Sequence, residues 1–249
     1  MLIEPEAFVH VPYLVGKIIA PEKSALRISR AAFEGWDRLA RTAGFGVNWR
    51  RSHEDREATR QKALAGRLDR DLWIFAYGSL MWDPAIEIVE IRTATLKGFH
   101  RRFCLETKIG RGSPERPALM AALDTGGECR GLAFRVPAQV VDRETEILWM
   151  REMISDGYIP IIAGVETPQG DVEALAFVVN KECSRFCEID LTSAAQIIAT
   201  GKGLLGSNLE YFNNLAEHMQ MLGIDDRLFK EIRSRLAESF TEQQPPHSS

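Results

Sequence analysis

The feature that decides the fold of this chain is the segment Asp71-Leu72-Trp73-Ile74-Phe75-Ala76-Tyr77-Gly78-Ser79-Leu80-Met81-Trp82. An apolar run opened by a charged residue ends abruptly in Tyr-Gly-Ser-Leu. Short aromatic and β-branched runs are typical of buried strands, and Gly78 permits a tight turn at the end. Many strands end in an ordinary Gly-Ser turn, but loops held on a rigid strand often carry chemistry. The segment predicts a buried strand and a tight loop whose backbone N–H groups can face a ligand.

The composition is that of an ordinary globular protein. The chain has 249 residues, of which 45% are apolar and 27% are charged, so it can bury a sizeable core without disulfide staples. Its length suits one large domain, or one domain with an extension. The formal net charge is −4, whereas nucleic-acid-binding proteins usually carry a basic excess or stripe. We therefore expect no nucleic acid among its partners.

The four cysteines, Cys104, Cys129, Cys183 and Cys187, are too few to be a disulfide scaffold in so long a chain. Cys183 and Cys187 lie four positions apart and would form a metal-ligand pair only on a helix. No matching His/Cys pair stands at zinc-finger spacing. We therefore expect free thiols and no metal.

The chain also lacks the apolar stretch of about eighteen residues that a membrane-spanning helix needs. Residues 1–6 carry acids where a signal peptide carries bases. The sequence thus favours a cytoplasmic protein without a membrane partner.

The domain organisation that we predict has three parts. Residues 1–70 are an extension, with an amphipathic helix at 24–39 and a charged exposed helix or mobile linker at 52–70. Residues 71–240 form the catalytic domain. Residues 241–249 are a flexible polar tail.

The predicted elements after residue 70 are short strands, with helices entering late. This order favours an α+β fold, built as a small, mostly antiparallel β-barrel flanked by helices, over a parallel doubly wound sheet. Residues 118–123 and 131–136 are interpreted as a hairpin closed by a turn at 124–128. The other expected strands cover 86–91, 94–105, 158–162 and 172–179, and the helices cover 140–153, 190–199, 207–222 and 225–240.

Common hydrolase and nucleotide motifs are missing. The chain has no HExxH, and Ser79 has no GxSxG elbow, so neither a zinc hydrolase nor a Ser/His/Asp triad is indicated. The glycine-rich segment 201–208 matches neither phosphate-loop spacing, and we interpret it as a loop in which Ser207 or Asn208 caps the next helix. Cys104 follows two arginines, which would lower a thiol pKa, but a buried strand cysteine explains it more simply.

The carboxylate with the best chemical prospects is Glu152, which ends a predicted helix among apolar and aromatic residues. A glutamate held in an apolar pocket has a raised pKa, which suits proton transfer near neutral pH. The alternative is a solvated Arg151–Glu152 surface pair. On the residues alone both interpretations stay open.

Taken together, Tyr77-Gly78-Ser79-Leu80 and Arg151-Glu152 resemble the ChaC family of γ-glutamylcyclotransferases, in particular its bacterial members. The resemblance runs from Asp71 to about Leu236. Other matching segments follow in family order: His100–Leu105, Gly110–Gly112, Gly131–Pro137, Gly157–Pro160 and Gly203–Tyr211.

This chain departs from the family pattern at two places. Family members often carry Pro-Gly-Arg where this chain has Pro117-Ala118-Leu119. The role of that arginine is therefore unfilled, or falls to Arg111 or Arg116. The residues before Asp71 match nothing in the family pattern, and their function stays open.

The resemblance implies the γ-glutamylcyclotransferase-like barrel and a lyase reaction that needs no cofactor. The substrate is glutathione or another γ-glutamyl compound, cleaved by intramolecular aminolysis to 5-oxoproline and a free amine, which is Cys-Gly for glutathione. Glu152 would be the general acid/base. The substrate-binding residues that it implies are Tyr77, Gly78, Ser79, Leu80, Tyr158 and Tyr211.

Two alternatives remain at this stage. The chain could act on other γ-glutamyl amines or amino acids with the same base and loop, or it could be a non-catalytic γ-glutamyl-binding module. The sequence does not predict an oligomeric state.

Overall fold

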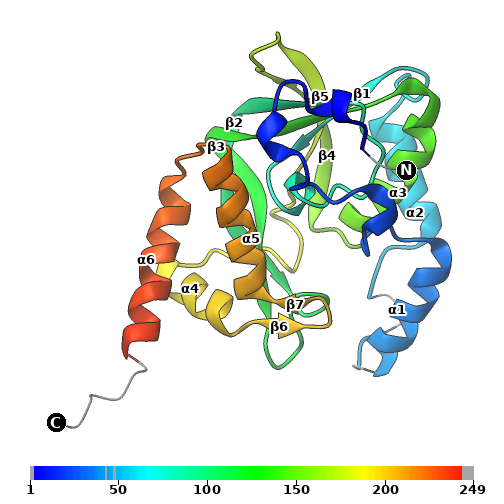
Figure 1. Cartoon of the computed structure of the whole chain (residues 1–249). Coiled ribbons are helices and arrows are strands. Elements are labelled where there is room, and N and C mark those ends of the chain that lie inside the picture. The colour runs from blue at the N-terminus through cyan, green and yellow to red at the C-terminus, as the bar shows by residue number, and fades with distance from the viewer. Residues whose placement is uncertain (1–2, 43, 47–48, 243–249) are drawn as a thin grey trace. The chain divides into compact units, whose positions relative to one another are not determined.

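The computed structural model describes residues 3–242 except 43, 47 and 48 (Figure 1). Most of the predicted tail, residues 243–249, lies outside the described residues. The chain divides into two compact units, each built from two separate segments. The first unit contains residues 1–100 and 123–184, and the second contains residues 101–122 and 185–249.

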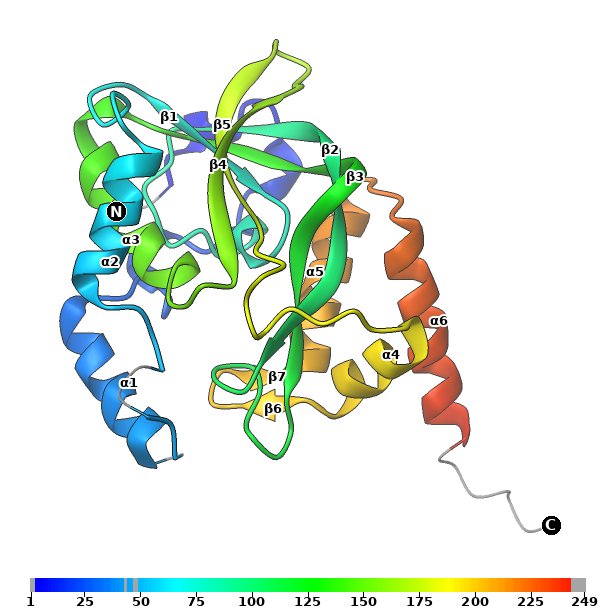
Figure 2. The ribbon, with the colours of Figure 1, turned by 180° about the vertical axis from the view of Figure 1, so that it is seen from behind.

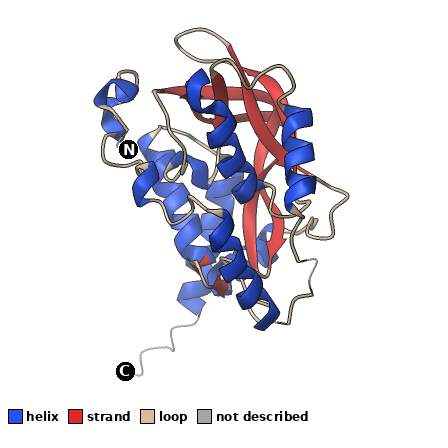
Figure 3. Cartoon of the chain, turned by 90° about the vertical axis from the view of Figure 1, so that its right-hand side faces the viewer, coloured by secondary structure: helices blue, strands red, loops and turns tan. Residues whose placement is uncertain are grey.

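Five strands form the main sheet: β1 (Leu72–Ala76), β2 (Glu90–Thr107), β3 (Ala118–Val136), β4 (Tyr158–Val165) and β5 (Val172–Val179). Their order is β2-β3-β1-β5-β4. The β1–β3 and β4–β5 pairs are antiparallel, while β1 and β5 are parallel. The strands, coloured red in Figure 3, alternate with helices irregularly along the chain. The predicted α+β class is therefore confirmed.

The outer strands of this sheet also meet each other. Thr95 of β2 and Glu166, which follows β4, exchange two backbone hydrogen bonds of 2.9 Å. The sheet therefore curls until its edges touch at one bridge. Apolar side chains of the first unit fill its interior, among them Phe75, Leu96 and Ala133.

The predicted hairpin at 118–136 is wrong, because these residues form one unbroken strand, β3. Gly126 and Gly127 have φ values of +100° and +69°, but they bend the strand instead of reversing it. The Gly126 carbonyl lies 3.1 Å from Nδ1 of His100 on β2. The residues after the glycines continue the same strand and pair with β1 through Leu132–Val136, so they do not turn back beside residues 118–123.

The predicted strand at 86–91 is also wrong over most of its length, since β2 begins at Glu90. Ile86 and Ile88 are buried, which explains the alternating pattern. The backbone N–H of Glu87 donates to the Glu144 carboxylate at 3.0 Å instead of to a neighbouring strand. Gly98 lies inside β2 with φ +83°.

The helices of the first unit are α1 (Arg30–Thr42), α2 (His53–Ala63) and α3 (Val141–Glu152). Helix α1 starts later than predicted, because short 3-10 turns at Pro5–Phe8, Pro12–Leu14 and Pro21–Lys23 precede it. Each turn begins at a proline, whose fixed φ suits a first helical position. Figure 1 shows α2 (cyan) beside α3 (green).

The second unit contains the late helices (Figure 2). Phe212 and Phe229 stack there with ring centroids 4.1 Å apart, and the buried Arg101 forms a 2.8 Å ion pair with Asp226. Its helices agree with the predictions to within two residues. They are α4 (Leu191–Thr200), α5 (Asn208–Met221) and α6 (Arg227–Glu242), with a small hairpin of β6 (Lys202–Gly203) and β7 (Gly206–Ser207) before α5.

Candidate active site

The loop after β1 has the predicted form of a buried strand followed by a tight turn. Residues Ser79–Met81 form a single 3-10 turn, in which the N–H groups of Met81, Trp82 and Asp83 bond back to Gly78 and Ser79. The N–H groups of residues 78–80 stand at its start, where so short a helix offers no internal acceptor. Gly78 has φ −125°, so it is not a left-handed position. Ser79 is half-buried and Leu80 is buried.

Helix α3 brings the candidate carboxylate into the first unit. Asp142 and Glu144 stand in its first turn, where acids are favoured by the helix dipole, and Glu152 is its last residue. Only 8% of the Arg151 side chain and 14% of the Glu152 side chain are exposed. The alternative of a solvated surface pair is therefore wrong.

Arg151 links the carboxylate to the loop after β1. Its Nε lies 3.0 Å from Oε1 of Glu152. Its Nη2 donates to Oγ of Ser79 at 2.8 Å, and its Nη1 donates to the carbonyl of Asp83. One guanidinium thus contacts Glu152 and the Tyr-Gly-Ser-Leu turn together. Sequence reasoning missed Arg151 as a site residue, and its position beside Glu152 was the available signal.

Burial raises the pKa of Glu152, and the positive charge of Arg151 opposes that rise only in part. The position at the C-terminal end of α3 acts in the same direction as burial, since the helix dipole is negative there. A carboxylate of this kind exchanges a proton more readily near neutral pH than an exposed one.

Two tyrosines of the first unit, Tyr77 and Tyr158, contact Phe177 of β5. The Tyr77 hydroxyl donates to the Phe177 carbonyl at 2.8 Å. The Tyr158 ring lies edge-on to the Phe177 ring at 6.4 Å, and Trp149 of α3 lies at 5.3 Å from the same ring. Phe177 therefore connects the residue that follows β1 with β4 and α3.

Tyr211 lies on α5 in the second unit, where it is buried and packs edge-on against Phe103 at 6.3 Å. Its role in substrate binding stays a prediction. Arg111 forms a 3.0 Å ion pair with Glu210, whereas Arg116 is exposed. Which of these arginines, if either, replaces the family arginine is likewise untested.

The glycine-rich segment before α5 has a structural role, as predicted. Ser207 caps α5 by accepting a 3.0 Å bond from the N–H of Glu210. The buried Asn208 side chain accepts from the Leu119 N–H at 2.7 Å and donates to the Leu119 carbonyl at 2.8 Å. These bonds hold the start of α5 against β3.

The four cysteines are free thiols. Cys183 and Cys187 lie in a turn and the extended segment after it, so the helical spacing that a metal pair would need does not arise. Across residues 3–242, apart from the three omitted positions, no group of three or more His, Cys, Asp or Glu side chains could hold a metal ion. In the same described part, no helix is both long and apolar enough to span a membrane.

Comparison with known structures identifies the type of fold. A crystal structure of the γ-glutamyl cyclotransferase specific to glutathione from yeast superposes with a TM-score of 0.63 at 18% identity. The match covers 68% of this chain and 96% of the yeast chain. The fold is thus that of a γ-glutamylcyclotransferase.

Comparison of sequences then defines the family. The family model described as ChaC-like protein matches residues 72–238, and this chain belongs to that family. The glutathione-specific gamma-glutamylcyclotransferase of Escherichia coli K12 is 38% identical over 199 residues, which cover 76% of this chain and 85% of the relative. The human glutathione-specific gamma-glutamylcyclotransferase 1 is 32% identical over 159 residues, covering 61% of this chain and 71% of the relative.

Proposed function

We propose that this protein is a glutathione-specific γ-glutamylcyclotransferase, which converts glutathione to 5-oxoproline and Cys-Gly. Its relatives in Escherichia coli and human carry that activity in their names. The observation that carries the proposal for the site is the buried Glu152, held by an arginine that also contacts Ser79.

The reaction needs one group that both accepts and donates a proton. The α-amino nitrogen of the γ-glutamyl residue attacks its own γ-carbonyl carbon, so a C–N bond forms and closes a five-membered ring. The former amide C–N bond then breaks, and the leaving nitrogen takes a proton. Glu152 removes the proton from the attacking amine and returns it to the leaving amine, so the step is balanced without a further reactant.

Positioning of the reacting groups supplies much of the remaining rate acceleration. Because the attack is intramolecular, its effective molarity can reach about 10⁵ M or more when the groups are well oriented. The N–H groups of residues 78–80 are placed to stabilise the tetrahedral oxyanion or to hold the substrate carboxylate. Ser79 accepts a bond from Arg151, so its own proton is directed to another acceptor, which we propose is the substrate. Tyr77 and Leu80 support the loop and Tyr158 borders the bound substrate, while the substrate-binding role expected for Tyr211 stays a prediction from the sequence.

The domain and barrel assignments belong to the same proposal. The Thr95–Glu166 bridge supports a small, mostly antiparallel barrel in which the five-stranded sheet closes on itself. Residues 71–240 are the catalytic domain, and residues 1–70 are an extension of it. A cytoplasmic location stays a prediction.

One assay tests the proposed function. The protein is incubated with glutathione, and 5-oxoproline and Cys-Gly are quantified by mass spectrometry, with γ-glutamyl amino acids as competing substrates. Equal amounts of both products from glutathione support the proposal. Turnover of γ-glutamyl amino acids alone would assign the chain to another substrate class. Glutathione binding without either product would identify a binding module.

A further inference from the structure

The N-terminal extension contacts the loop that carries Ser79. We name residues 18–27 the strap. The backbone N–H of Ile19 donates to the Trp82 carbonyl at 2.7 Å. The Ser24 hydroxyl donates to Oδ1 of Asp83 at 2.6 Å. Asp83 is the residue whose carbonyl accepts from Arg151, so the strap and Arg151 hold the same residue from two directions.

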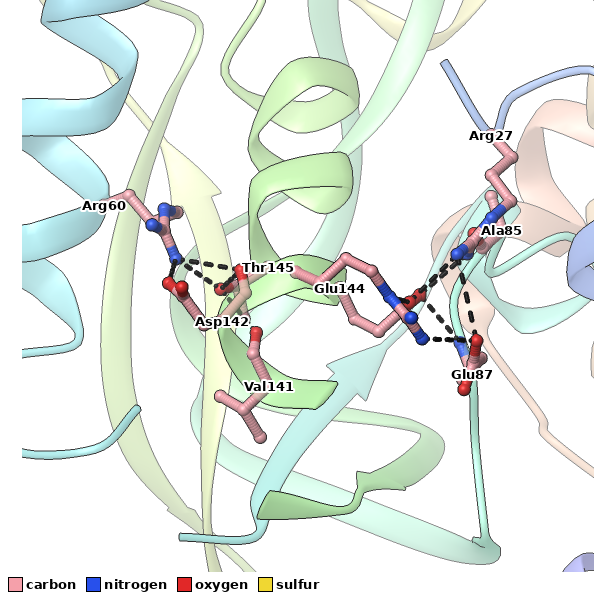
Figure 4. Close-up of polar contacts among 9 residues, drawn as sticks. Arg27, Arg60, Ala85, Glu87, Val141, Asp142, Glu144 and Thr145 are labelled. Carbon is pink, nitrogen blue, oxygen red and sulfur yellow. Dashed lines mark hydrogen bonds and ion pairs between the residues drawn. The ribbon is translucent and has the colours of Figure 1, made fainter. Parts of the chain in front are cut away.

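Arg27, at the end of the strap, connects that loop to helix α3 (Figure 4). Its Nη1 donates to the Ala85 carbonyl at 2.8 Å and to Oε2 of Glu144 at 2.7 Å, and its Nη2 donates to Oε1 of Glu144 at 2.9 Å. The Glu144 side chain has no exposed surface. Burial by itself would raise the pKa of Glu144, but bonds from Arg27, the Glu87 N–H and Arg143 outweigh it and lower the pKa. Glu144 is therefore a buried carboxylate that depends on the strap.

The backbone at Ala85 supports the same interpretation. Ala85 has φ +60°, and among the described residues it is the one non-glycine residue with a positive φ. This conformation is strained for an alanine, and such strain persists only where surrounding contacts hold it. The bond from Arg27 to the Ala85 carbonyl is one such contact.

The rest of the extension holds helix α3 along its length. Arg60 of α2 donates to Oδ1 of Asp142 at 2.8 Å and to the Thr145 hydroxyl at 2.9 Å (Figure 4). Trp149 donates to the Thr59 hydroxyl at 3.1 Å. Ile28 and Phe33 form a small apolar cluster with Met150, the residue before Arg151. The extension thus fixes α3 and, through the strap, the loop that faces it.

We infer that Ser24 and Arg27 are positioning residues for the proposed reaction. They hold the Ser79–Ala85 loop in the position relative to α3 in which Arg151 contacts both Glu152 and Ser79. Neither residue lies in the segment that the family model matches. The inference rests on the proposed function for its kinetic consequence, but its structural consequence can be measured independently. A displacement of about 1 Å at a catalytic group can cost about 10²-fold in rate.

The test compares four full-length variants. Ser24→Ala removes the bond to Asp83, and Arg27→Lys keeps the charge but cannot form the planar two-nitrogen contact with Glu144 and Ala85 together. Ser29→Ala is the matched serine control, because the bond described for its hydroxyl, from the Ala32 N–H, lies at the start of α1. Arg67→Lys is the matched arginine control, because Arg67 pairs with Glu173 on β5. Each is assayed for kcat and KM across pH, and by hydrogen–deuterium exchange.

We expect Ser24→Ala and Arg27→Lys to lower kcat about 10-fold or more and to accelerate exchange in residues 79–85. Among the described contacts, the charged group next to Glu152 is Arg151 on the same helix, and Arg151 in turn contacts Ser79 and the Asp83 carbonyl on the loop. Once Asp83 no longer holds Arg151 in place, Arg151 lowers the pKa of Glu152 less. The acidic limb of the kcat/KM profile therefore moves to higher pH. Loss of folded enzyme alone would scale the profile down without moving the limb.

The inference would be overturned if both strap variants kept the wild-type acidic limb of kcat/KM and the wild-type exchange of residues 79–85. It would also be overturned if the two control variants showed the same changes as the strap variants. If the wild-type protein forms no 5-oxoproline from glutathione, the proposed function has failed. The inference about Ser24 and Arg27 is then tested by hydrogen–deuterium exchange alone. Faster exchange of residues 79–85 in the strap variants only would then support the coupling, and equal exchange in all variants would overturn it.

Discussion

Arg151 donates a hydrogen bond of 2.8 Å to the Ser79 hydroxyl across 72 positions of sequence. The same guanidinium lies 3.0 Å from the Glu152 carboxylate. A nucleophilic serine needs a general base that accepts its hydroxyl proton, whereas the side-chain partner described for Ser79 is a cation that donates to its oxygen. The contact therefore favours Ser79 as a binding residue and Glu152 as the proton carrier.

Replacing Glu152 with glutamine should abolish turnover without unfolding the protein. The amide cannot accept the proton of the attacking amine, and loss of a general base typically costs about 10²–10⁴-fold. Initial rates of 5-oxoproline formation measure this. Glu146→Gln, on the same helix, is the control and should keep its rate. A Glu152→Gln enzyme with more than about a tenth of wild-type activity would contradict the assignment.

The same substitution should change how stability depends on pH. The folded-state pKa of Glu152 is raised above its ordinary value of 4.5, so above pH 4.5 the folded state holds more protons than the unfolded state. Stability then falls as pH rises up to the folded-state pKa. Glu152→Gln lacks this loss, so its advantage over the wild type should grow as the pH rises from 4.5 towards the folded-state pKa. Urea unfolding at several pH values measures it, and an advantage that shrinks with pH would refute the raised pKa.

Arg151→Gln should move the acidic limb of the kcat/KM profile to higher pH. Arg151 lowers the pKa of Glu152 against the effect of burial, so removing its charge lets the pKa rise further. The rate at neutral pH should also fall, because Ser79 loses its donor. Arg67→Gln serves as the control. A limb at its wild-type position would show that Arg151 does not act on the titrating group.

Ser79→Ala should weaken turnover but leave it measurable. Loss of one hydroxyl donor to an oxyanion costs about 10²–10³-fold, whereas loss of a nucleophile would remove the reaction pathway. Intact-mass spectrometry of the wild-type enzyme during turnover should find no γ-glutamyl adduct. An adduct on Ser79 would reverse the roles that we assign to Ser79 and Glu152.

Chelators should leave the activity unchanged, since the proposed reaction uses only proton transfer and hydrogen bonding. The measurement is the rate of 5-oxoproline formation after treatment with EDTA or 1,10-phenanthroline and gel filtration. Inactivation that zinc reverses would point back to Cys183 and Cys187 as ligands.

The parts of the fold that local pattern determines could be predicted from the sequence. Strand β5 has the predicted bounds, and Ser207 caps α5, because burial and capping depend on neighbouring residues. Gly126 and Gly127 could not be interpreted correctly from the pattern, since whether paired glycines reverse a strand or bend it depends on its partner, here β1. Likewise, Ile86 and Ile88 alternate like a strand, but a glutamate on α3 takes the N–H between them.

The candidate site was predictable to a similar degree. Glu152 and the Tyr-Gly-Ser-Leu turn stand out because each is chemically unusual in its local sequence. The contacts that join them do not, because Arg151, Asp83 and Ser24 are ordinary polar residues until the fold brings them together. The role that we propose for the extension cannot be predicted from the sequence for the same reason, since its contacts with the loop and with α3 are long-range.

The two compact units interleave along the chain, because the polypeptide passes from one to the other at residues 100–101, 122–123 and 184–185. Strands β2 and β3 each have residues in both units. No single cut can therefore separate one unit whole from the other, and a fragment that ends between residues 107 and 183 leaves both incomplete. Each unit is therefore compact in the fold but is assembled from two separate segments of the sequence.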